Sequence, residues 1–330
     1  MVGPTASKVS ERFSRSSLAL DVEMDTGRIL DFLQASVTQT LRRQGAVVGI
    51  SGGIDSSVVL ALCVRAFGPQ RVIGILLPEK ESSPESAELA AGLAAQLGVE
   101  ALTEDITAAL EGAGCYRRRD EAIRRVFPDY VPGWKAKISL PGNLLEQNTL
   151  NVFSLTVRRP DGQESTRRLP PKEFSQIVAA SSFKQRTRMA MLYYHAERLN
   201  FAVAGTAQKN EHDLGFFVKY GDGGVDVSPI LHLYKSQVYQ MAEYLGIPEE
   251  IRRRTPTTDT YPGGSTQEEF FYRIPFEILD LVWLGLERGI PQDEIAAALD
   301  LTPEQVRWIE ADIQHKQRAT ETLRAAPLRL

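Results

Sequence analysis

Apolar positions recur along the chain in two spacings, one typical of helices and one of buried strands. Within residues 18–44 they repeat every three or four positions, which predicts an amphipathic helix. The short apolar segments 46–50 (AVVGI) and 71–77 (RVIGILL) are rich in β-branched residues, which favours buried parallel strands. Helical patterns follow them at 58–68 and 84–97. This alternation of helix and strand predicts an α/β fold with a parallel sheet.

Residues 140–175 break this alternation. Two segments of alternating apolar and polar residues flank Asp161-Gly162, a dipeptide typical of tight hairpin turns. We therefore expect an inserted β-hairpin at this place in the chain. The helix–strand pattern resumes at 183–205, and a further helix is predicted over 234–245.

The pattern predicts one folded domain. Residues 1–17 are polar, and we expect them to form a mobile N-terminus. Residues 18–330 are then a single domain that carries the 140–175 ribbon as an insertion and ends in a helical part over 276–330. In that part, Thr302 begins the sequence TPEQ and is the predicted N-cap of a helix. A chain of 330 residues can bury enough apolar surface to fold without disulfides or a structural metal.

Composition and charge narrow the class of protein. Lys and Arg number 38 against 42 Asp and Glu, a formal net charge of −4, which excludes a nucleic-acid binder that works by bulk positive charge. Cys63 and Cys115 are too few for a disulfide framework, and the four histidines lack metal-binding spacing. No apolar segment approaches the ~20 residues that span a bilayer. We expect a cytoplasmic protein with neither a membrane nor a nucleic-acid partner.

The segment SGGIDSS at 51–57 carries the strongest chemical signal. Its adjacent glycines, between a predicted strand and a predicted helix, let backbone N–H groups turn inward at a helix N-terminus, a geometry that binds phosphate. The carboxylate of Asp55 would repel phosphate unless a cation lies between them, so it predicts Mg²⁺. The segment lacks the lysine of a Walker A loop. A tight turn capped by serines, with no ligand, is the alternative interpretation.

This segment resembles the signature of the N-type ATP pyrophosphatases, which cleave ATP between its α and β phosphates. Further segments, in the same order and at similar spacing, resemble the ammonia-dependent NAD synthetases of that superfamily. They are LPEKESSPES at 77–86, KQRTRM at 184–189, GTAQKNE at 205–211, FFVKYGDGGVDVSPILHLYKSQV at 216–238, PTTD at 256–259 and the pair His315-Lys316.

The resemblance implies a doubly wound, twisted parallel sheet flanked by helices, which is a Rossmann-like fold, and a homodimer. It implies that Asp55 and Glu211 hold Mg²⁺ and, with Lys235, form the catalytic groups. The residues that would bind ATP are Gly49, Ile50, Ser51, Gly52, Gly53, Ile54, Asp55, Ser56, Thr206, Lys235 and Thr257. The residues that would bind the dinucleotide substrate are Arg186, Lys219, Asp226, His315 and Lys316.

The implied activity is that of a ligase that forms a C–N bond. It amidates nicotinic acid adenine dinucleotide (deamido-NAD) to NAD with ammonia, through an acyl-adenylate, and releases AMP and pyrophosphate. Arg186, Lys219 and Lys235 lie beside glycine-rich or helix-start segments, as expected for cations that clamp polyphosphate. Taken one at a time, each is also compatible with a solvated surface cation.

The nitrogen source follows from the two cysteines and from the extent of the resemblance. The synthetase-like segments begin within the first fifty residues, and neither Cys63 nor Cys115 lies in a glutaminase-like pattern. We therefore expect no fused glutaminase, with ammonia taken up free or delivered by a separate glutaminase partner.

The chain departs from the pattern of these synthetases at several positions. Glu79 replaces a frequent tyrosine, Ser182 replaces an asparagine, and GGSTQEEFF at 263–271 replaces a more acidic segment. The 140–175 ribbon is an insertion. These departures lie away from the ATP loop and leave three alternatives: a related adenylating amide ligase acting on another carboxylate, a non-catalytic nucleotide-binding homologue, and a tRNA-modifying relative, which the acidic charge and the lack of a CxxC pair disfavour.

Overall fold

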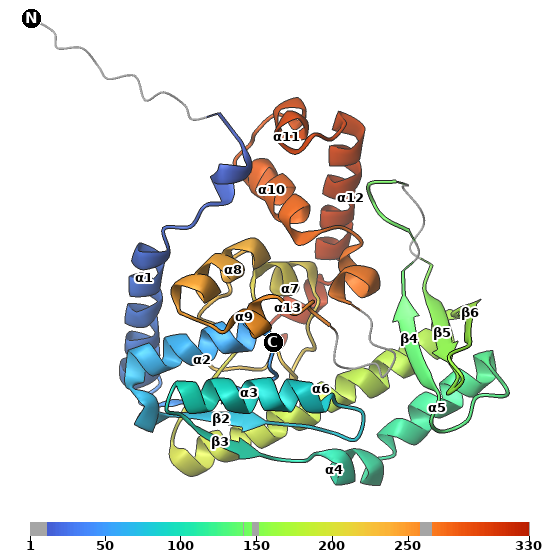
Figure 1. Ribbon diagram of the computed structural model, residues 1–330, viewed down its shortest axis with the longest axis horizontal. Coiled ribbons are helices and arrows are strands. Elements are labelled where there is room, and N and C mark those ends of the chain that lie inside the picture. The colour runs from blue at the N-terminus through green and yellow to red at the C-terminus, as the bar shows by residue number, and fades with distance from the viewer. Residues whose placement is uncertain (1–11, 141, 147–151, 258–265, 330) are drawn as a thin grey trace, which may run out of the picture.

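A four-stranded parallel sheet and the helices packed on its two faces form the centre of the protein (Figure 1). The computed structural model describes residues 12–140, 142–146, 152–257 and 266–329. The strands of the parallel sheet are β1 (Ala46–Gly49), β2 (Val72–Leu76), β3 (Glu100–Thr103) and β7 (Ala202–Ala204). The spatial order is β3-β2-β1-β7, so the doubly wound α/β fold is confirmed.

Helices cover both faces of this sheet. On one side lie α1 (Val22–Gln34), which a π-helical segment continues over Ala35–Thr40, α2 (Ile54–Phe67), α3 (Pro84–Gln96), α8 (Lys235–Tyr244) and α9 (Glu249–Arg252). On the other side lies the long helix α6 (Pro171–Leu199), flanked by α4 (Thr107–Gly112) and α5 (Cys115–Val126). The predicted helices at 84–97 and 234–245 are confirmed, whereas α6 begins at Pro171 rather than near residue 183.

The alternation of side chains along β1 explains this layering. Ala46 and Val48 pack into one core with α2 and α8, while Val47 points to the opposite face. There it meets Met189 and Leu192 of α6. Successive side chains of a strand point to opposite faces, so a strand that is apolar throughout must be covered on both sides.

The strand order reverses beside β1. From β1 the chain passes through α2 to β2 and then outward to β3, whereas β7 pairs with the other edge of β1. The loops that follow β1 and β7 therefore leave the same edge of the sheet in opposite directions. Open α/β sheets bind ligands in the crevice at such a switch point, outside the carboxyl ends of the strands.

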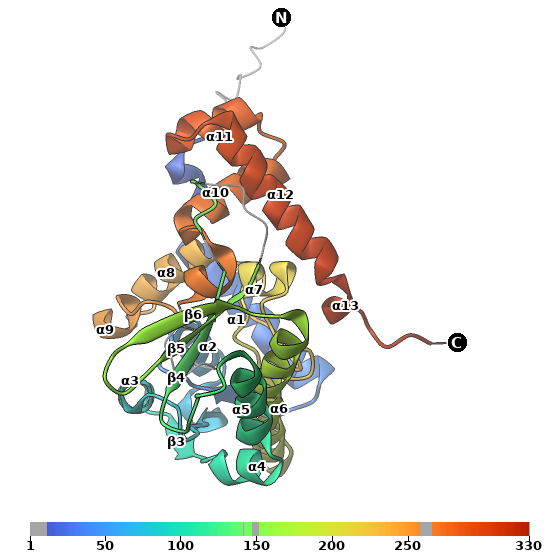
Figure 2. The same ribbon diagram turned by 90° about the vertical axis from the view of Figure 1, so that its right-hand side faces the viewer.

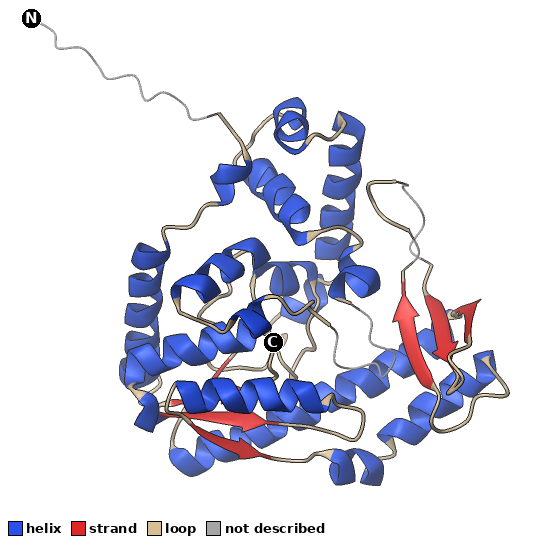
Figure 3. Cartoon of the chain, viewed as in Figure 1, coloured by secondary structure: helices blue, strands red, loops and turns tan. Residues whose placement is uncertain are grey.

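A second, antiparallel sheet lies apart from the first (Figure 3). Its strands are β4 (Lys135–Ser139), β5 (Ser154–Arg158) and β6 (Glu164–Arg168). The predicted hairpin is confirmed: β5 and β6 are antiparallel, and Gly162 in the connecting turn has a φ of 86°. The sequence pattern missed β4, which precedes the predicted ribbon and pairs with β5. Residues 141 and 147–151 of the predicted ribbon lie outside the described residues.

The C-terminal helices form a separate apolar cluster that stands beside the sheet layers (Figure 2). They are α10 (Phe276–Glu287), α11 (Gln292–Leu299) and α12 (Pro303–Ala319), preceded by a π-helical turn at Glu268–Tyr272. The short helix α13 (Glu321–Arg324) follows α12 and buries none of its own residues. Thr302 caps α12 as predicted, because its hydroxyl accepts a hydrogen bond from the Gln305 N–H. Two short 3₁₀ helices, Arg15–Leu18 and Pro69–Arg71, and helix α7 (Lys209–Leu214) complete the elements.

The N-terminal segment is packed from an early point. Residues 1–11 lie outside the described residues, but Phe13 and Leu18 are buried in the cluster of C-terminal helices. The Phe13 N–H donates a hydrogen bond to Glu294. Packing thus begins within the range 1–17 that the sequence pattern assigned to a mobile N-terminus.

Candidate active site

The loop from β1 into α2 is shaped by one glycine that a larger residue could not replace. Gly52 has a φ of 72°, a left-handed conformation that side chains with a Cβ rarely adopt. A Cβ at this position would lie 2.4 Å from the carbonyl oxygen of Ser86 in α3. The loop can therefore pack closely against α3 only with glycine at position 52.

The serines of the same loop brace it from within. The hydroxyls of Ser56 and Ser57 both donate to the carbonyl oxygen of Gly53, at 3.0 and 2.9 Å. The Gly53 N–H in turn donates to the Ser51 hydroxyl at 3.3 Å. The first N–H groups of α2 have no partner within the helix, and they mark the positive end of its dipole. The predicted phosphate-binding geometry, a glycine turn leading into a helix N-terminus, is present.

Three charged side chains meet at the start of α2. Lys235, the first residue of α8, places its Nζ 2.5 Å from Asp55 Oδ2, and its side chain has no exposed surface. Glu211 of α7 is close enough that the negative charge of Asp55 raises its pKa. Asp55 follows β1 and Glu211 follows β7, so the switch point of the sheet brings the two carboxylates together.

Burial and mutual charge shift the pKa values of these groups. Burial raises the pKa of Glu211 to about 8, and Asp55 adds to the rise, while Lys235 opposes it. Burial alone would lower the pKa of Lys235, but the carboxylates of Asp55 and Glu211 outweigh it and raise that pKa. One lysine thus faces two partly buried carboxylates. The site has an excess of negative charge that a further cation would relieve.

A second set of polar contacts fixes the starts of α7 and α8. Asn210 accepts a hydrogen bond from the Lys235 N–H at 3.0 Å and donates to Asp280 of α10. The same carboxylate accepts from the N–H and the hydroxyl of Ser236, both at 2.7 Å. Burial raises the pKa of Asp280 to about 6. This largely buried network joins the starts of α7 and α8 to α10 and so fixes the helices that carry Glu211 and Lys235 relative to each other.

A cavity of about 680 Å³ opens over these groups, and most of the predicted site residues line it. The predicted ATP-binding residues that line it are Gly49, Ile50, Ser51, Gly53, Ile54, Asp55, Ser56, Thr206, Lys235 and Thr257. Gly52 lies behind the loop against α3. Glu211, Arg186 and Lys219 also line the cavity. The structure thus gathers side chains from distant parts of the sequence around one space.

Three predicted dinucleotide-binding residues lie outside this cavity. Asp226 accepts hydrogen bonds from the Tyr193 hydroxyl at 3.0 Å and the Val203 N–H at 2.8 Å, which ties the loop before α8 to β7. His315 is exposed on α12. Lys316 is buried, and its ammonium donates to Asp312 and to the carbonyl oxygen of Phe271. Their role in substrate binding stays a prediction.

Arg186 and Lys219 lie at the end of the cavity nearest the C-terminal segment. Arg186 Nε donates to the carbonyl oxygen of Lys219 at 3.2 Å. This bond joins α6 to the residue that precedes the YGDGG loop (residues 220–224). The Lys219 ammonium donates to the carbonyl oxygens of Thr322 and Ala325, at 3.1 and 2.6 Å. Both are cations at the rim of a space large enough for a nucleotide, and this geometry suits a phosphate group.

The structure adds cavity residues that the sequence pattern did not single out. Asp222 of the YGDGG loop accepts a hydrogen bond from the Val218 N–H at 2.9 Å, and burial raises its pKa to about 6. Gln267 Nε2 donates a hydrogen bond to Glu211 Oε1 at 3.4 Å. An apolar wall is formed by Phe153, Phe174, Phe216, Phe217, Phe270 and Phe271. The sequence carries no periodic signal for these aromatics, because they come from four separate segments.

The carboxylate pair suits a small divalent cation. Asp55 Oδ1 is buried and has no hydrogen-bond partner among the described residues, and the same is true of Gln267 Oε1. A cation beside them would supply the missing partner and favour ionised Glu211. Mg²⁺ typically takes one or two protein carboxylates and completes its shell with water and substrate phosphates. The described ranges contain no group of three or more His, Cys, Asp or Glu placed to bind a metal.

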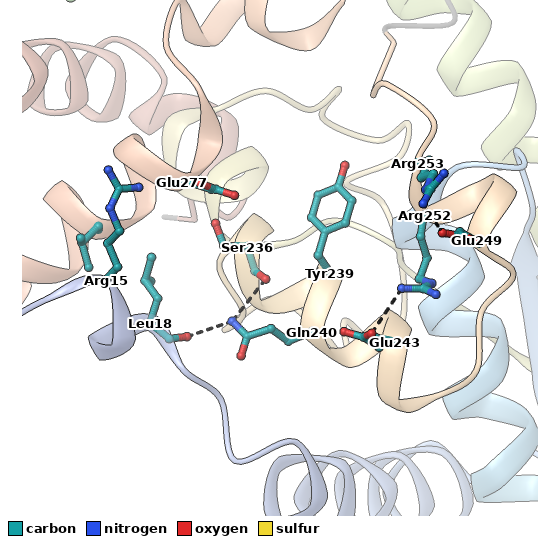
Figure 4. A pocket seen from close by; sticks show the side chains of 11 residues that line it. Arg15, Leu18, Ser236, Tyr239, Gln240, Glu243, Glu249, Arg252, Arg253 and Glu277 are labelled. Atoms are coloured by element: carbon teal, nitrogen blue, oxygen red, sulfur yellow. Dashed lines mark hydrogen bonds and ion pairs between the residues drawn. The ribbon is translucent and has the colours of Figure 1, made fainter. Parts of the chain in front are cut away.

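A second cavity, of about 500 Å³, lies between the N-terminal 3₁₀ turn, α8, α9 and α10 (Figure 4). Its arginines and glutamates largely neutralise each other, with Arg252 paired to Glu243 and Arg253 to Glu249. Gln240 bonds to the backbone of Leu18 and closes one wall. The charged residues that line this cavity are balanced in sign, so they do not indicate a ligand of either charge.

Two residues that depart from the synthetase pattern, Glu79 and Ser182, differ in their position relative to the large cavity. Ser182 lines the large cavity, whereas the Glu79 side chain is fully buried beside it and does not line it. Of the segment 263–271, residues 263–265 lie outside the described residues, and Phe270 and Phe271 line the cavity.

Comparison with known proteins identifies a family. The family described as NAD synthase matches residues 26–122 and 152–321, which include the hairpin strands and leave out β4. The NH(3)-dependent NAD(+) synthetase of Mesorhizobium japonicum is 53% identical over 311 residues, covering 94% of this chain and 97% of that protein. That of Rhizobium meliloti is 50% identical, covering 96% and 94%.

A solved structure shares the fold. The NH3-dependent NAD synthetase of Campylobacter jejuni superposes with a TM-score of 0.60 at 25% identity, covering 94% of this chain and all of that one. Among the described residues, no helix combines the length and the apolar character needed to cross a membrane.

Proposed function

The chain belongs to the NAD synthase family, and on that premise we propose that it is an ammonia-dependent ligase that converts deamido-NAD to NAD at the expense of ATP. The observation that supports this most directly is the convergence of Asp55, Lys235 and Glu211 beneath the β1 loop. Curated relatives that align over nearly the whole chain bear this activity in their names.

The reaction proceeds in two substitutions. A carboxylate oxygen of the nicotinate ring attacks the α-phosphorus of ATP, the bond from that phosphorus to the bridging oxygen breaks, and pyrophosphate leaves. The nitrogen of ammonia then attacks the acyl carbon of the adenylate, AMP leaves, and a proton passes from nitrogen to solvent. Neither step requires a protein nucleophile, so the protein acts by positioning and by electrostatic stabilisation.

The β1 loop and Lys235 carry the electrostatic part. The N–H groups at the start of α2 bind phosphate oxygens, on which negative charge accumulates as pyrophosphate leaves. Lys235 is already held by Asp55 and needs no reorganisation to face that charge. Thr206 and Thr257 also line the cavity and supply hydroxyl groups to ATP.

The same carboxylates are the proposed Mg²⁺ ligands. Mg²⁺ held by Asp55 and Glu211 would neutralise phosphate charge during the substitution. The buried Asp55 Oδ1, which lacks a hydrogen-bond partner within the described part of the chain, supports this assignment. Glu211, with its raised pKa, is in the neutral form over part of the physiological range until a cation favours its ionised form.

Binding of the dinucleotide is assigned to the other end of the cavity. Arg186 and Lys219 are placed to hold its phosphates, and Asp226, His315 and Lys316 are proposed as further contacts. The last three lie outside the cavity of one subunit, which is compatible with a site that two subunits share. Support for a homodimer comes from α6, where Phe183 and Tyr194 are 39% and 56% exposed on one helix face.

The test measures pyrophosphate release from MgATP and ammonium, with and without deamido-NAD, and identifies the product by mass. We expect strong stimulation by deamido-NAD and a product that carries the amide. Asp55→Asn should abolish release, whereas Lys209→Met, at an ion-paired lysine that does not line the cavity, should retain it. Release of pyrophosphate without stimulation by deamido-NAD would leave ATP activation intact and assign another carboxylate as the acceptor.

A further inference from the structure

A buried charge cluster lies directly behind the wall of the large cavity. Its centre is an ion pair between Glu79 and Lys184, with Nζ 2.8 Å from Oε1. The Glu79 side chain has no exposed surface, and only 1% of the Lys184 side chain is exposed. Charges this deeply buried are rare unless each is paired and hydrogen-bonded, because removing them from water is costly.

Each oxygen of the Glu79 carboxylate has a partner. Oε1 accepts from Lys184, while Oε2 accepts from the Tyr116 hydroxyl at 2.6 Å and from the Glu81 N–H at 3.1 Å. The carboxylate therefore joins three segments: α6 through Lys184, α5 through Tyr116, and its own loop through the backbone of Glu81. Such a fully satisfied polar network holds its members in a single geometry.

A second carboxylate extends the network on the same loop. Glu81 accepts from Lys184 at 2.8 Å and from Arg119 of α5 at 2.5 Å. Burial alone would raise the pKa of Glu81, but Arg119 and Lys184 outweigh it and lower that pKa. Lys184 thus bridges two glutamates that lie two residues apart, and the loop between them cannot move without breaking an ion pair.

The loop that these glutamates anchor forms part of the cavity wall. It connects β2 to α3, and Leu77, Pro78, Ser82 and Ser83 line the cavity. A turn closes on Glu79, whose carbonyl oxygen accepts from the Ser82 N–H at 2.8 Å and whose N–H donates to the Ser82 hydroxyl at 3.0 Å. The anchored residue thereby sets the direction of the serines beside it.

We propose that Glu79 and Lys184 are positioning residues for ATP, which fix the 77–83 loop as the wall against which the nucleoside half of ATP binds. Two observations indicate that the nucleoside half of ATP is the part of the ligand that lies beside this loop. The loop follows β2, and in doubly wound sheets the carboxyl end of the second strand lies beside the nucleoside of a nucleotide whose phosphates sit on the loop after the first. Ser86, one turn into α3, packs against Gly52 of that phosphate loop. The inference rests on the proposed function only in taking ATP as the ligand.

Lys184 also connects the loop to the substrate-facing side of α6. Its neighbours Gln185 and Arg186 line the cavity, and Arg188, one turn further on, donates to the Leu77 carbonyl oxygen at 3.2 Å. Helix α6 thus holds the 77–83 loop at Leu77, Glu79 and Glu81. The identity of residue 79, a departure from the tyrosine frequent in these synthetases, is explained by the buried partner that faces it rather than by contact with a substrate.

Substitutions can separate a positioning role of Glu79 and Lys184 from a purely structural role, because a structural pair would affect stability without a specific effect on ATP binding. Removing one member of a buried ion pair leaves an uncompensated charge and is destabilising, whereas replacing both members by apolar residues of similar size is often neutral for stability. The double variant Glu79→Leu/Lys184→Met therefore separates folding from positioning. It loses the hydrogen bonds to Tyr116 and to the Glu81 backbone that shape the loop, but it leaves no lone buried charge opposite residue 79.

The experiment measures the Kd of ATP by calorimetry, the KM values of ATP and deamido-NAD, and the Tm. For the double variant we expect a Tm lowered by only a few degrees, because the buried Tyr116 hydroxyl loses its acceptor. We expect Kd and KM for ATP to rise at least tenfold and KM for deamido-NAD to change less than threefold. Glu79→Gln and Lys184→Arg are the milder variants, and we expect Lys184→Arg to retain the most ATP affinity. Arg117→Ala, at an exposed ion pair on α5, is the matched control and should leave all values unchanged.

A folded double variant with unchanged ATP affinity would overturn the inference and make the pair a structural element only. So would an equal rise in the KM of both substrates, because a general loosening of the fold would cause it. Failure of the unmodified protein to form NAD would instead contradict the proposed function, and direct calorimetric titration of ATP would still decide the role of Glu79 and Lys184.

Discussion

Lys235 Nζ lies 2.5 Å from Asp55 Oδ2, an ion pair between the first residue of α8 and the second residue of α2, 180 positions apart in the sequence. Each residue lies in the first turn of a helix. The first N–H groups of α2 are free to bind anions, whereas those of Lys235 and Ser236 in α8 donate to Asn210 and Asp280. The pair therefore places a lysine and a carboxylate at the meeting point of two helix N-termini. This arrangement can bind a polyphosphate together with a cation.

Substitution of Lys235 by methionine should damage catalysis more than folding alone explains. Without the ammonium, Asp55 and Glu211 are two partly buried carboxylates with no compensating charge, and the phosphate site loses a cation. We expect kcat for pyrophosphate release to fall by about 10²-fold or more, the range for loss of one preorganised electrostatic group. Steady-state kinetics on the folded fraction, measured with Lys209→Met as the control, gives the comparison. An equal loss in both variants would contradict the assignment.

The two substitutions Gly52→Ala and Gly68→Ala should have different effects on ATP binding. Both glycines have a φ above +70°, so both variants carry a backbone strain of roughly 1–2 kcal/mol. At position 52 the new Cβ would also lie 2.4 Å from the Ser86 carbonyl oxygen, whereas at position 68 it meets nothing within 4 Å. We expect both variants to lose stability and only Gly52→Ala to lose ATP affinity. Thermal unfolding and ATP titration test this, and equal ATP affinities would show that the loop can shift without consequence.

The buried carboxyl of Asp280 should make stability depend on pH. Its pKa is raised to about 6 from the usual 3.8, so between these pH values the folded protein retains a proton that the unfolded chain has released. The free energy of unfolding therefore falls as pH rises through this window. Asp280→Asn cannot titrate, so its free energy of unfolding should fall less between pH 4 and pH 7.

The same variant should also be less stable throughout. The amide NH₂ group would face hydrogen-bond donors of Ser236, and an unsatisfied buried group costs about 1–3 kcal/mol. The unmodified protein has the larger free energy of unfolding, but it loses more of it as Asp280 ionises. We therefore expect the difference in free energy of unfolding between the two proteins to become smaller as pH rises to 7. Urea unfolding at several pH values measures it, with the exposed Asp293→Asn as the control. Parallel stability curves would rule out a titrating Asp280.

Charges placed on the exposed face of α6 should dissociate the proposed homodimer. Phe183 and Tyr194 lie on one face of this helix, eleven residues or about three turns apart, and both are well exposed in the single chain. We expect the double variant Phe183→Glu/Tyr194→Glu to be monomeric by light scattering and Val131→Glu, at another exposed apolar residue, to leave the assembly unchanged. A dimer that survives the double substitution would place the interface elsewhere.

Local sequence determined the elements and part of the chemistry of this protein. The apolar segments of β1 and β2, the hairpin turn at Gly162 and the Thr302 cap depend on neighbouring residues, so periodicity and turn chemistry predicted them. The glycine loop at 51–57 is likewise a local motif, and its geometry agrees with the prediction. β4 was missed because its partner, β5, begins fifteen residues after β4 ends.

Tertiary structure decided which side chains meet. Glu211 joins Asp55 because β7 pairs with the free edge of β1, and no local pattern specifies that strand order. The sequence showed Glu79 only as a departure from a motif, whereas the fold places Lys184 beside it as a buried ion-pair partner. Asp226 and Lys316 make structural contacts outside the cavity. The physical reason is range: periodicity and capping act over a few residues, whereas a buried charge is stabilised only by the partner that long-range packing brings to it.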